Sequence, residues 1–259
     1  MDSIKVIKIG GNVVDNPEAL ASFCKDFAAL EGPKVLVHGG GVIASQIQKA
    51  LGQEPVKIAG RRVTDSETLK VVTMVYAGYC NKTITALLQK EGCNAIGLSG
   101  CDGNVICAGK RPPLMIDGKE VDFGFVGDVR PDSVNVQFIE GLVSMGITPV
   151  ICAINHDGRG NLLNTNADTI ASSVAVALRS ELVYCFEKNG VLMDKDDDSS
   201  VIPVITPELF AKLKEEGVIA DGMIPKLENS FRAIEKGATK VTIKNSADLL
   251  ADKGTTLCR

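Results

Sequence analysis

Short apolar runs alternate with amphipathic stretches along the whole chain, and this alternation is the main structural signal. The runs are rich in Val and Ile, as is typical of strands that are buried on both faces of a sheet. We expect a strand in each of them: Ile4–Ile9, Lys34–Val37, Ala95–Leu98, Ile147–Ile154, Leu182–Phe186 and Thr239–Ile243.

The stretches between these runs have helical periodicity. In Glu67–Gln89, apolar side chains recur at steps of three and four residues. In Leu227–Gly237 an apolar stripe ends at a glycine, which is a common helix stop. Strands that alternate with helices predict an α/β fold, in which helices cover a mostly parallel sheet.

Two segments depart from this rhythm. Ser99–Val129 is rich in turn residues, including Asp117-Gly118, and predicts β-hairpins. Asp194–Ser200 is acidic and spaced somewhat like a calcium loop, but Ser199 and Ile205 stand where that loop needs Gly and Glu. We therefore expect a solvated turn there and no metal site in the chain.

Composition and charge exclude several classes of function. The formal net charge is −4, and no run of Lys or Arg is longer than the pair Arg61-Arg62, which argues against binding to nucleic acid or to an anionic membrane. The longest apolar stretch is too short for a membrane span, and the N-terminus does not resemble a signal peptide. The eight cysteines form no Cys-x-x-Cys motif, as is typical of free thiols in a reducing compartment. We expect a cytoplasmic protein.

Two glycine clusters, Gly10-Gly11 and Gly39-Gly40-Gly41, each follow a strand and precede a helix. Glycine lets the backbone approach a ligand closely, and the N–H groups of the following helix favour an anion. A tight turn explains either cluster alone equally well. Two such clusters in one chain favour binding of a phosphate or a carboxylate.

The second cluster also matches a weak dinucleotide fingerprint, Gly39-x-Gly41-x-x-Ala44. The acidic residue expected about 20 positions further on is missing, and Arg61-Arg62 stand there instead. This disfavours NAD but leaves an NADP-dependent oxidoreductase as an alternative.

Four charged residues are candidates for binding or catalysis. Lys8 comes just before the first glycine cluster, and Lys226 follows Pro225 in the first turn of a helix, where a cation is unfavourable unless an anion lies there. Asp168 lies near the start of another helix and either caps it or has a function. Arg62 either binds a carboxylate with its planar fork or forms a surface salt bridge.

Taken in order, these pieces resemble the acetylglutamate kinases, a branch of the amino acid kinase family. Any one motif is weak, but the ordered set covers nearly the whole chain. It consists of Ile7-Lys8-Ile9-Gly10-Gly11, Val37-His38-Gly39-Gly40-Gly41, Gly60-Arg61-Arg62-Val63-Thr64, Asn81-Lys82, Gly124-Phe125-Val126-Gly127, Leu163-Asn164-Thr165-Asn166-Ala167-Asp168 and Asp221-Gly222-Met223-Ile224-Pro225-Lys226.

The resemblance implies a three-layer αβα sandwich with two lobes. Residues 1–179 would bind the acylglutamate and form a homodimer, and residues 180–259 would bind the nucleotide. The implied reaction is phosphorylation of the side-chain carboxylate of an N-acyl-L-glutamate, acetyl or succinyl, by ATP with Mg²⁺, in arginine biosynthesis. The first strand begins by Ile4, without the N-terminal helix of hexameric, arginine-inhibited members, so we expect a homodimer that is insensitive to arginine.

The resemblance also implies roles for individual residues. Lys8 and Lys226 would neutralise the transferring phosphoryl group, and Asp168 would hold both ammonium groups. Substrate-binding residues would be Gly40, Gly41, Arg62 and Asn164. Nucleotide-binding residues would be Gly10, Gly11, Glu187, Lys188, Gly190, Val191, Leu192, Ile219 and Met223. Glu187 and Lys188 replace the family's usual Thr/Ser-Asp pair, so the contacts to the base or ribose can differ here.

Other family members act on aspartate, glutamate, carbamate or UMP, and the surroundings of Arg62 and Asn164 favour an acylated glutamate among these. A ligand sensor without catalytic activity is a third class, although Lys8, Asp168 and Lys226 are all present.

Overall fold

A single mixed sheet runs through the protein, and the computed structural model describes residues 3–219 and 223–258 of it. The strand order is β14–β16–β15–β13–β1–β2–β10–β5. The sheet strands are β1 (Lys5–Ile9), β2 (Lys34–His38), β5 (Ala95–Leu98), β10 (Thr148–Cys152), β13 (Glu181–Phe186), β14 (Val204–Ile205), β15 (Val241–Asn245) and β16 (Thr255–Leu257).

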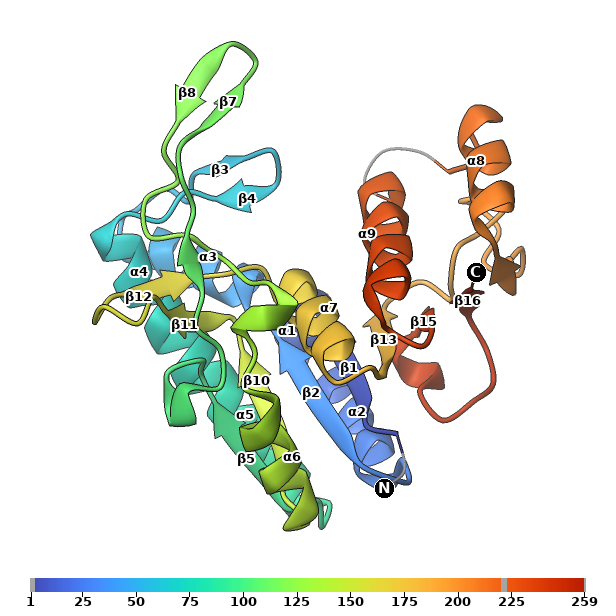
Figure 1. Cartoon of the computed structure of the whole chain (residues 1–259), viewed down its shortest axis with the longest axis horizontal. Helices are drawn as coiled ribbons and strands as arrows, with labels where there is room; N and C mark the ends of the chain where they lie inside the picture. The colour runs from blue at the N-terminus through green and yellow to red at the C-terminus, as the bar shows by residue number, and fades with distance from the viewer. Residues whose placement is uncertain (1–2, 220–222, 259) are drawn as a thin grey trace.

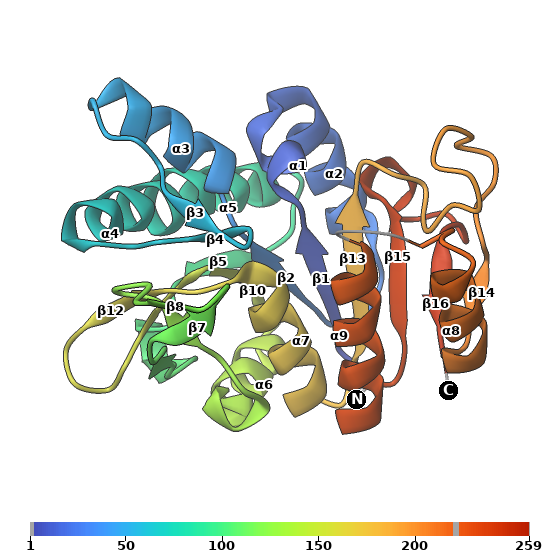
Figure 2. The ribbon, with the colours of Figure 1, turned by 90° about the horizontal axis from the view of Figure 1, so that it is seen from above.

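Helices cover both faces of this sheet (Figures 1 and 2). Among them, α2 and α5 lie on one face, and α6, α7 and α9 on the other. The helices are α1 (Gly11–Asp15), α2 (Pro17–Ala29), α3 (Gly41–Ala50), α4 (Ser66–Thr73), α5 (Asn81–Lys90), α6 (Val136–Ser144), α7 (Ala167–Ala177), α8 (Pro207–Glu215) and α9 (Met223–Lys236). Short 3₁₀ turns are η2 (Asp102–Asn104), η3 (Pro131–Ser133) and η4 (Ser246–Asp248).

The six neighbouring strands from β15 to β5 are parallel, whereas β16 is antiparallel to β15 and pairs with β14. The predicted α/β sandwich with a mostly parallel sheet is therefore confirmed. Each predicted strand is present, but the run Ile147–Ile154 is divided between β10 and the short strand β11 (Ile154–His156). The short strands β14 and β16 at one end of the sheet were not predicted, because two or three residues are too few to show a period.

The central strands are apolar because both of their faces are covered. Val6, Ile7 and Ile9 of β1 are fully buried, and so is most of β2. Lys8 is the buried charged residue of β1, because its cationic side chain is only 9% exposed, whereas Lys5 at the start of the strand is half-buried. Burying a charge is costly unless it is paired, so this lysine needs a partner.

The predicted helix over Glu67–Gln89 is continuous but not uniform. Between α4 and α5 the chain widens into a π-helix, η1 (Met74–Cys80). A π-turn adds a residue to the turn and shifts which side chains face inward. Here Tyr76 and Cys80 are buried, and both lie under the second glycine cluster.

Antiparallel pairs extend from the carboxyl end of the sheet (Figure 1). The predicted hairpins in Ser99–Val129 are present: β7 (Leu114–Ile116) pairs with β8 (Lys119–Val121), and β6 (Gly109–Lys110) pairs with β9 (Gly127–Asp128). Asp117 and Gly118 both have positive φ, as a two-residue type I′ turn requires. Further pairs are β3 (Lys57–Ile58) with β4 (Arg61–Arg62), and β11 with β12 (Leu162–Asn164).

The acidic segment Asp194–Ser200 forms a turn. The carboxylates of Asp194 and Asp197 accept hydrogen bonds from the N–H groups of Asp196 and Ser199. Within residues 3–219 and 223–258, no group of three or more His, Cys, Asp or Glu side chains is arranged to hold a metal ion. No helix in the same part of the chain is long and apolar enough to cross a membrane.

Candidate functional site

The glycine turns and three helix starts gather at the carboxyl ends of β1, β2 and β13. Gly10 and Gly11 lead from β1 into α1, and Gly39 and Gly40 lead from β2 into α3. α7 begins at the same end of the sheet. In parallel α/β sheets, ligands bind at this end, where strand order reverses and helix N–H groups lack partners within the helix.

The backbone of Gly40 requires glycine. Its φ is +152°, and a Cβ there would lie 2.9 Å from both Tyr76 Cδ1 and Cys80 Sγ. The π-turn therefore packs directly against this glycine. Gly11 has more space, since a Cβ would meet Val42 only at 3.7 Å.

The side chain of His38 is hydrogen-bonded to the backbone of the second glycine turn. It is fully buried, and burial lowers its pKa to about 4. Its Nε2 lies 3.0 Å from the side-chain nitrogen of Asn81, which can only donate, so Nδ1 carries the proton and donates to the carbonyl of Gly39 at 2.8 Å. His38 is therefore a neutral structural residue and not an acid–base catalyst.

Lys8 and Asp168 form an ion pair at the site. The Nζ atom of Lys8 lies 2.7 Å from Oδ1 of Asp168, and this carboxylate is 39% exposed. Asn166 caps α7, because its side-chain oxygen accepts from the N–H groups of Asp168 and Thr169. Asn166 therefore already caps α7, so the Asp168 carboxylate is not needed for capping and pairs with Lys8 instead.

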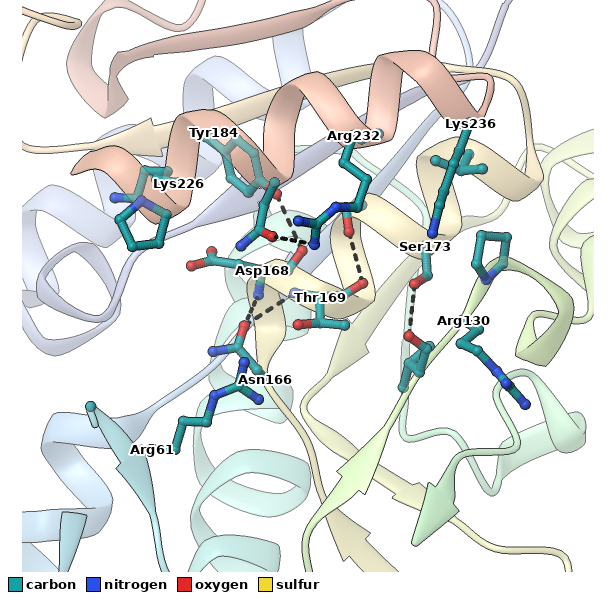
Figure 3. Close-up of a pocket in the computed structure, with 18 of the residues that line it drawn as sticks. Arg61, Arg130, Asn166, Asp168, Thr169, Ser173, Tyr184, Lys226, Arg232 and Lys236 are labelled. Atoms are coloured by element: carbon teal, nitrogen blue, oxygen red, sulfur yellow. Dashed lines mark hydrogen bonds between the residues drawn. The ribbon is translucent and has the colours of Figure 1, made fainter. Parts of the chain in front are cut away.

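Lys226 approaches the same place from α9 (Figure 3). α9 begins at Met223, so Pro225 is its third residue and not its first, but Lys226 still lies near the helix start. Burial, with a smaller effect of the neighbouring Lys8, lowers the Lys226 pKa, and Asp168 partly opposes this. Two ammonium groups beside one carboxylate leave a positive charge that suits an anion.

Phe186, which sequence reasoning missed, lies close to both lysines. The Nζ atom of Lys226 is 3.5 Å from the centre of its ring, and that of Lys8 is 5.2 Å away. Tyr184 stacks on Phe186 and donates a hydrogen bond to the backbone carbonyl of Asp168. The sequence signal that could have found these aromatics is their spacing, since Tyr184 and Phe186 are two residues apart in β13 and therefore lie on the same face of the strand. In the structure β13 pairs with β1, and Tyr184 lies opposite Lys8.

A cavity of about 210 Å³ brings together the predicted substrate-binding residues Gly40, Gly41, Arg62 and Asn164. The guanidinium of Arg62 is buried and donates to the Gly41 carbonyl at 2.8 Å, to Ser45 Oγ at 2.7 Å and to Gln48 Oε1. These partners fix the plane of the guanidinium.

Asn164 lines the same cavity, and its side-chain nitrogen donates to Thr64 Oγ1 at 2.9 Å. That bond fixes the orientation of the amide. Sequence reasoning missed Ser45, Gln48 and Thr64, which hold the two predicted side chains in place.

A second cavity, of about 440 Å³, contains Asp168 and Lys226. Gly60, Arg61 and Asn166 line both cavities, so the two adjoin. Figure 3 shows Arg61 reaching toward Asn166 from the β3–β4 hairpin. A group bound near Arg62 and a group bound near Lys226 can therefore meet between them.

The predicted nucleotide-binding residues are less closely grouped. Glu187 follows Phe186 and acts electrostatically on Lys226, whereas Lys188 forms an exposed ion pair with Asp198 at 3.2 Å. Gly190 has a structural reason to be glycine, because a Cβ would lie 2.7 Å from Thr255 Oγ1.

The remaining predicted nucleotide-binding residues are Val191, Leu192, Ile219 and Met223. The hydroxyl of Thr255 accepts from the N–H of Val191, which is buried like Ile219. Leu192 forms a bridge with Val201, and Met223 begins α9. Asp221 and Gly222 of the motif that ends at Lys226 lie outside the described residues.

Comparison with known proteins identifies the family of this chain. The model of the amino acid kinase family matches residues 3–245. Proteins named acetylglutamate kinase are similar to this chain: that of Cytophaga hutchinsonii is 53% identical over 96% of this chain and 94% of its own length. That of Phocaeicola vulgatus is 52% identical over 99% and 98%.

Solved structures share the fold. The N-acetylglutamate synthase of Neisseria gonorrhoeae, complexed with coenzyme A and N-acetyl-glutamate, superposes with a TM-score of 0.81 at 24% identity; this chain is covered to 99% and spans 59% of the synthase chain. The carbamate kinase of Giardia lamblia has a TM-score of 0.68 at 15% identity, with 99% of this chain and 98% of that chain covered. With the family model matching almost the whole chain and relatives above 50% identity, the chain belongs to the amino acid kinase family.

Proposed function

We propose that this protein phosphorylates the side-chain carboxylate of an N-acyl-L-glutamate with ATP, as a step of arginine biosynthesis. The proposal rests on one observation, which is that two cavities lie next to each other. One contains Arg62 and Asn164, and the other contains Lys226 and Asp168. The names of the relatives, which are acetylglutamate kinases, support the same activity.

In this proposal the acceptor lies in the smaller cavity. Arg62 binds the α-carboxylate, because its rigid fork matches two carboxylate oxygens. Asn164 binds the amide, and the N–H groups of Gly40 and Gly41 face the side-chain carboxylate. That carboxylate is already ionised at neutral pH, so it attacks phosphorus without a general base.

Phosphoryl transfer depends mainly on positioning and on stabilising the negative charge of the transition state. The ammonium groups of Lys8 and Lys226 both lie close to the Phe186 ring, where they neutralise the oxygens of the transferring group. Asp168 holds Lys8 through the 2.7 Å ion pair and acts on Lys226 at longer range. The N–H groups of Gly10 and Gly11 complete the binding of the ATP phosphates.

We propose that ATP is used with Mg²⁺. The Asp168 carboxylate is already paired with Lys8 at 2.7 Å, so Mg²⁺ would bind mainly to the nucleotide phosphates and water, a mode of binding that needs no group of protein ligands. When bound, the ion supplies positive charge to the phosphate oxygens.

The division of labour between the lobes is also a proposal. Residues 1–179 contain the acceptor cavity, and residues 180–259 bind the nucleotide, with Glu187, Lys188, Gly190, Val191, Leu192, Ile219 and Met223 around the base and ribose. The chain is proposed to be cytoplasmic and to form a homodimer. Two large apolar side chains, Met74 and Tyr79, are exposed one π-turn apart on η1, which supports a protein partner there.

The alternative, an NADP-dependent oxidoreductase that uses the Gly39–Ala44 loop, has no support in the comparisons. It would also leave Asp168 and Lys226 without a role. Both relatives described above are named as kinases, not oxidoreductases.

The test is to incubate the purified protein with MgATP and N-acetylglutamate, N-succinylglutamate or unmodified glutamate. ADP release and trapping of the acyl phosphate with hydroxylamine are measured together. We expect both signals with an acylated glutamate and neither with glutamate. Oxidation of NADPH at 340 nm without ADP release would contradict the proposal.

A further inference from the structure

The ring of Phe186 lies against the first glycine turn and against both lysines of the site, yet the proposed mechanism gives it no role. Phe186 is the last residue of β13, which pairs with β1. A Cβ at Gly10 would lie 3.4 Å from its Cδ1 atom, so the ring packs on that turn. The ammonium groups of Lys226 and Lys8 lie 3.5 Å and 5.2 Å from the centre of the same ring.

The Phe186 ring is held in place by the residue two positions before it. The rings of Tyr184 and Phe186 are stacked, with their centres 5.9 Å apart and their planes at 16°. Tyr184 is buried, and its hydroxyl donates to the backbone carbonyl of Asp168 at 3.2 Å. The aromatic surface beside Lys226 is therefore fixed relative to the start of α7.

Lys226 depends on this surface more than Lys8 does. The Asp168 carboxylate lies 2.7 Å from the Nζ atom of Lys8 and acts on Lys226 only at longer range. Within residues 3–219 and 223–258, no hydrogen bond or ion pair reaches the Nζ atom of Lys226, which lies over the ring instead. A partly buried cation without such a bond is costly, and the negative face of an aromatic ring offsets part of that cost.

A contact of this kind suits a lysine that has to change partners. The ring attracts the charged amine but forms no directional bond with it. Phosphate oxygens carry full negative charges and attract an ammonium group more strongly than the quadrupole of a ring does. A lysine that rests on the ring is therefore already charged before the nucleotide binds, and it can leave the ring when phosphates arrive.

We infer that Phe186 is a positioning residue, whose ring holds the charged Lys226 ammonium in the nucleotide-free protein and releases it to the phosphates of ATP. The inference rests on the proposed kinase function and deepens it. Phe186 touches no reacting group in this mechanism. It acts through Lys226, which it keeps beside the glycine turn that receives the same phosphates.

The other charges around the Lys226 ammonium come from several elements. Burial lowers its pKa, Asp168 on α7 opposes this, Lys8 on β1 adds to it, and Glu187 after β13 opposes it more weakly. The other titratable groups that line the cavity, among the described residues, are Arg61, Arg130, Tyr184, Arg232 and Lys236. A substitution of Phe186 alters none of these groups, so a change in the pKa of Lys226 reports the ring.

The first test measures kcat/KM for ATP against pH with a saturating N-acylglutamate. The alkaline limb of this profile reports the pKa of Lys226 in the nucleotide-free enzyme. Phe186→Leu keeps an apolar side chain but removes the aromatic face, so its limb should move to lower pH by about one unit. Phe186→Tyr should keep the wild-type limb. KM for the acylglutamate should change less than about twofold in both variants, because Phe186 does not line the acceptor cavity.

Phe210→Leu is the matched control. Phe210 is a partly buried ring on α8, with the Lys214 ammonium 5.9 Å from its centre, and it packs against Phe231 of α9 at 5.6 Å. This variant loses a similar ring and a similar contact without touching Lys226, so its limb should stay where the wild type has it. An equal shift in Phe210→Leu would mean that looser packing of α9 is sufficient, and it would overturn the inference.

A second measurement does not depend on turnover or on the folding of Phe186→Leu. The chain contains no tryptophan, so Phe186→Trp introduces a single indole beside the Lys226 ammonium. In the nucleotide-free variant, the emission of this indole should change with pH as Lys226 loses its proton. Adding Lys226→Met should abolish that transition, whereas adding Lys214→Met should leave it in place.

The outcomes separate the inference from the function on which it rests. A lower limb in Phe186→Leu than in Phe186→Tyr, with an indole transition that requires Lys226, supports the inference. Equal limbs, with activity lost in the same proportion at every pH, overturn it and leave the kinase function standing. If the wild type releases no ADP with any N-acylglutamate, the proposed function fails, and the presence or absence of the indole transition decides whether the ring holds Lys226.

Discussion

The ammonium group of Lys226 lies 3.5 Å from the centre of the Phe186 ring, close enough for a strong cation–π contact. An aromatic face attracts a cation but replaces only part of the water that the cation gives up on burial. This is why the pKa of Lys226 is lowered although Asp168 is near.

The lowered pKa predicts an alkaline limit to activity. Lys226 is charged below its pKa, so kcat/KM for ATP should fall as pH rises through that lowered value. Bound phosphates favour the charged form of Lys226, so the alkaline limb of the kcat profile should lie at higher pH than that of the kcat/KM profile. Lys226→Arg should remove the limb, because a guanidinium stays protonated, whereas Lys212→Arg on α8 should leave it in place. A limb unchanged in Lys226→Arg would assign it to another group.

Removing either ammonium group should slow turnover. Lys8→Ala and Lys226→Ala should each lower kcat by about 10²–10³ with modest changes in KM, because the charges act mainly in the transition state. Steady-state kinetics with saturating ATP and acceptor measures this. Lys70→Ala, which breaks an exposed pair with Glu67, serves as the control. An increase in KM with unchanged kcat would mean that the lysines bind only the ground state.

The variant Asp168→Asn tests whether Asp168 positions the two lysines or only caps α7. Since Asn166 already caps α7, a role of Asp168 in the helix predicts nearly normal kcat. A role in holding Lys8 predicts a marked loss, because the amide cannot form the ion pair. The double variant Lys8→Ala/Asp168→Asn should then cost much less than the product of the single effects. Multiplicative losses would show that the two residues act independently.

Arg62→Lys should separate the two substrates. The lysine keeps the charge but loses the planar fork and the bonds to Gly41, Ser45 and Gln48. KM for the acylglutamate should rise at least about tenfold, with KM for ATP within about twofold. Initial rates with each substrate varied in turn decide this, and equal increases in both KM values would remove Arg62 from the acceptor site.

Acid should weaken the fold through His38. Its pKa is about 4 in the folded protein and near 6.5 when unfolded, so the unfolded chain binds more protons between these values. Stability is therefore lost as pH falls from about 6.5 to 4, by about 3 kcal/mol. Urea unfolding across this range should show a smaller acid loss for His38→Asn than for wild type. His156→Asn should keep the wild-type pH dependence.

Much of the fold was readable from the sequence because its cause is local. The apolar runs of β1 and β2 and the glycines after them follow from burial on both faces and from tight turns. The π-turn was not readable, because Tyr76 lies in a stretch whose steps of three and four also fit an ordinary helix. Phe186 was missed for another reason. Its role depends on a neighbour in space, β1, that the order of residues does not reveal.

The pairing of β1 with β13 has a consequence for how the molecule comes apart. All five residues of β1 are in register with β13, so one ladder of hydrogen bonds joins residues 1–179 to residues 180–259. The C-terminal part is therefore not a unit that could be exchanged on its own. Cutting the chain after Arg179 would strip β1 of a neighbour along its whole length and expose a flat apolar edge, which is prone to aggregation. We expect any substrate-driven motion in the hairpins instead, which extend beyond the sheet and can shift without breaking that ladder.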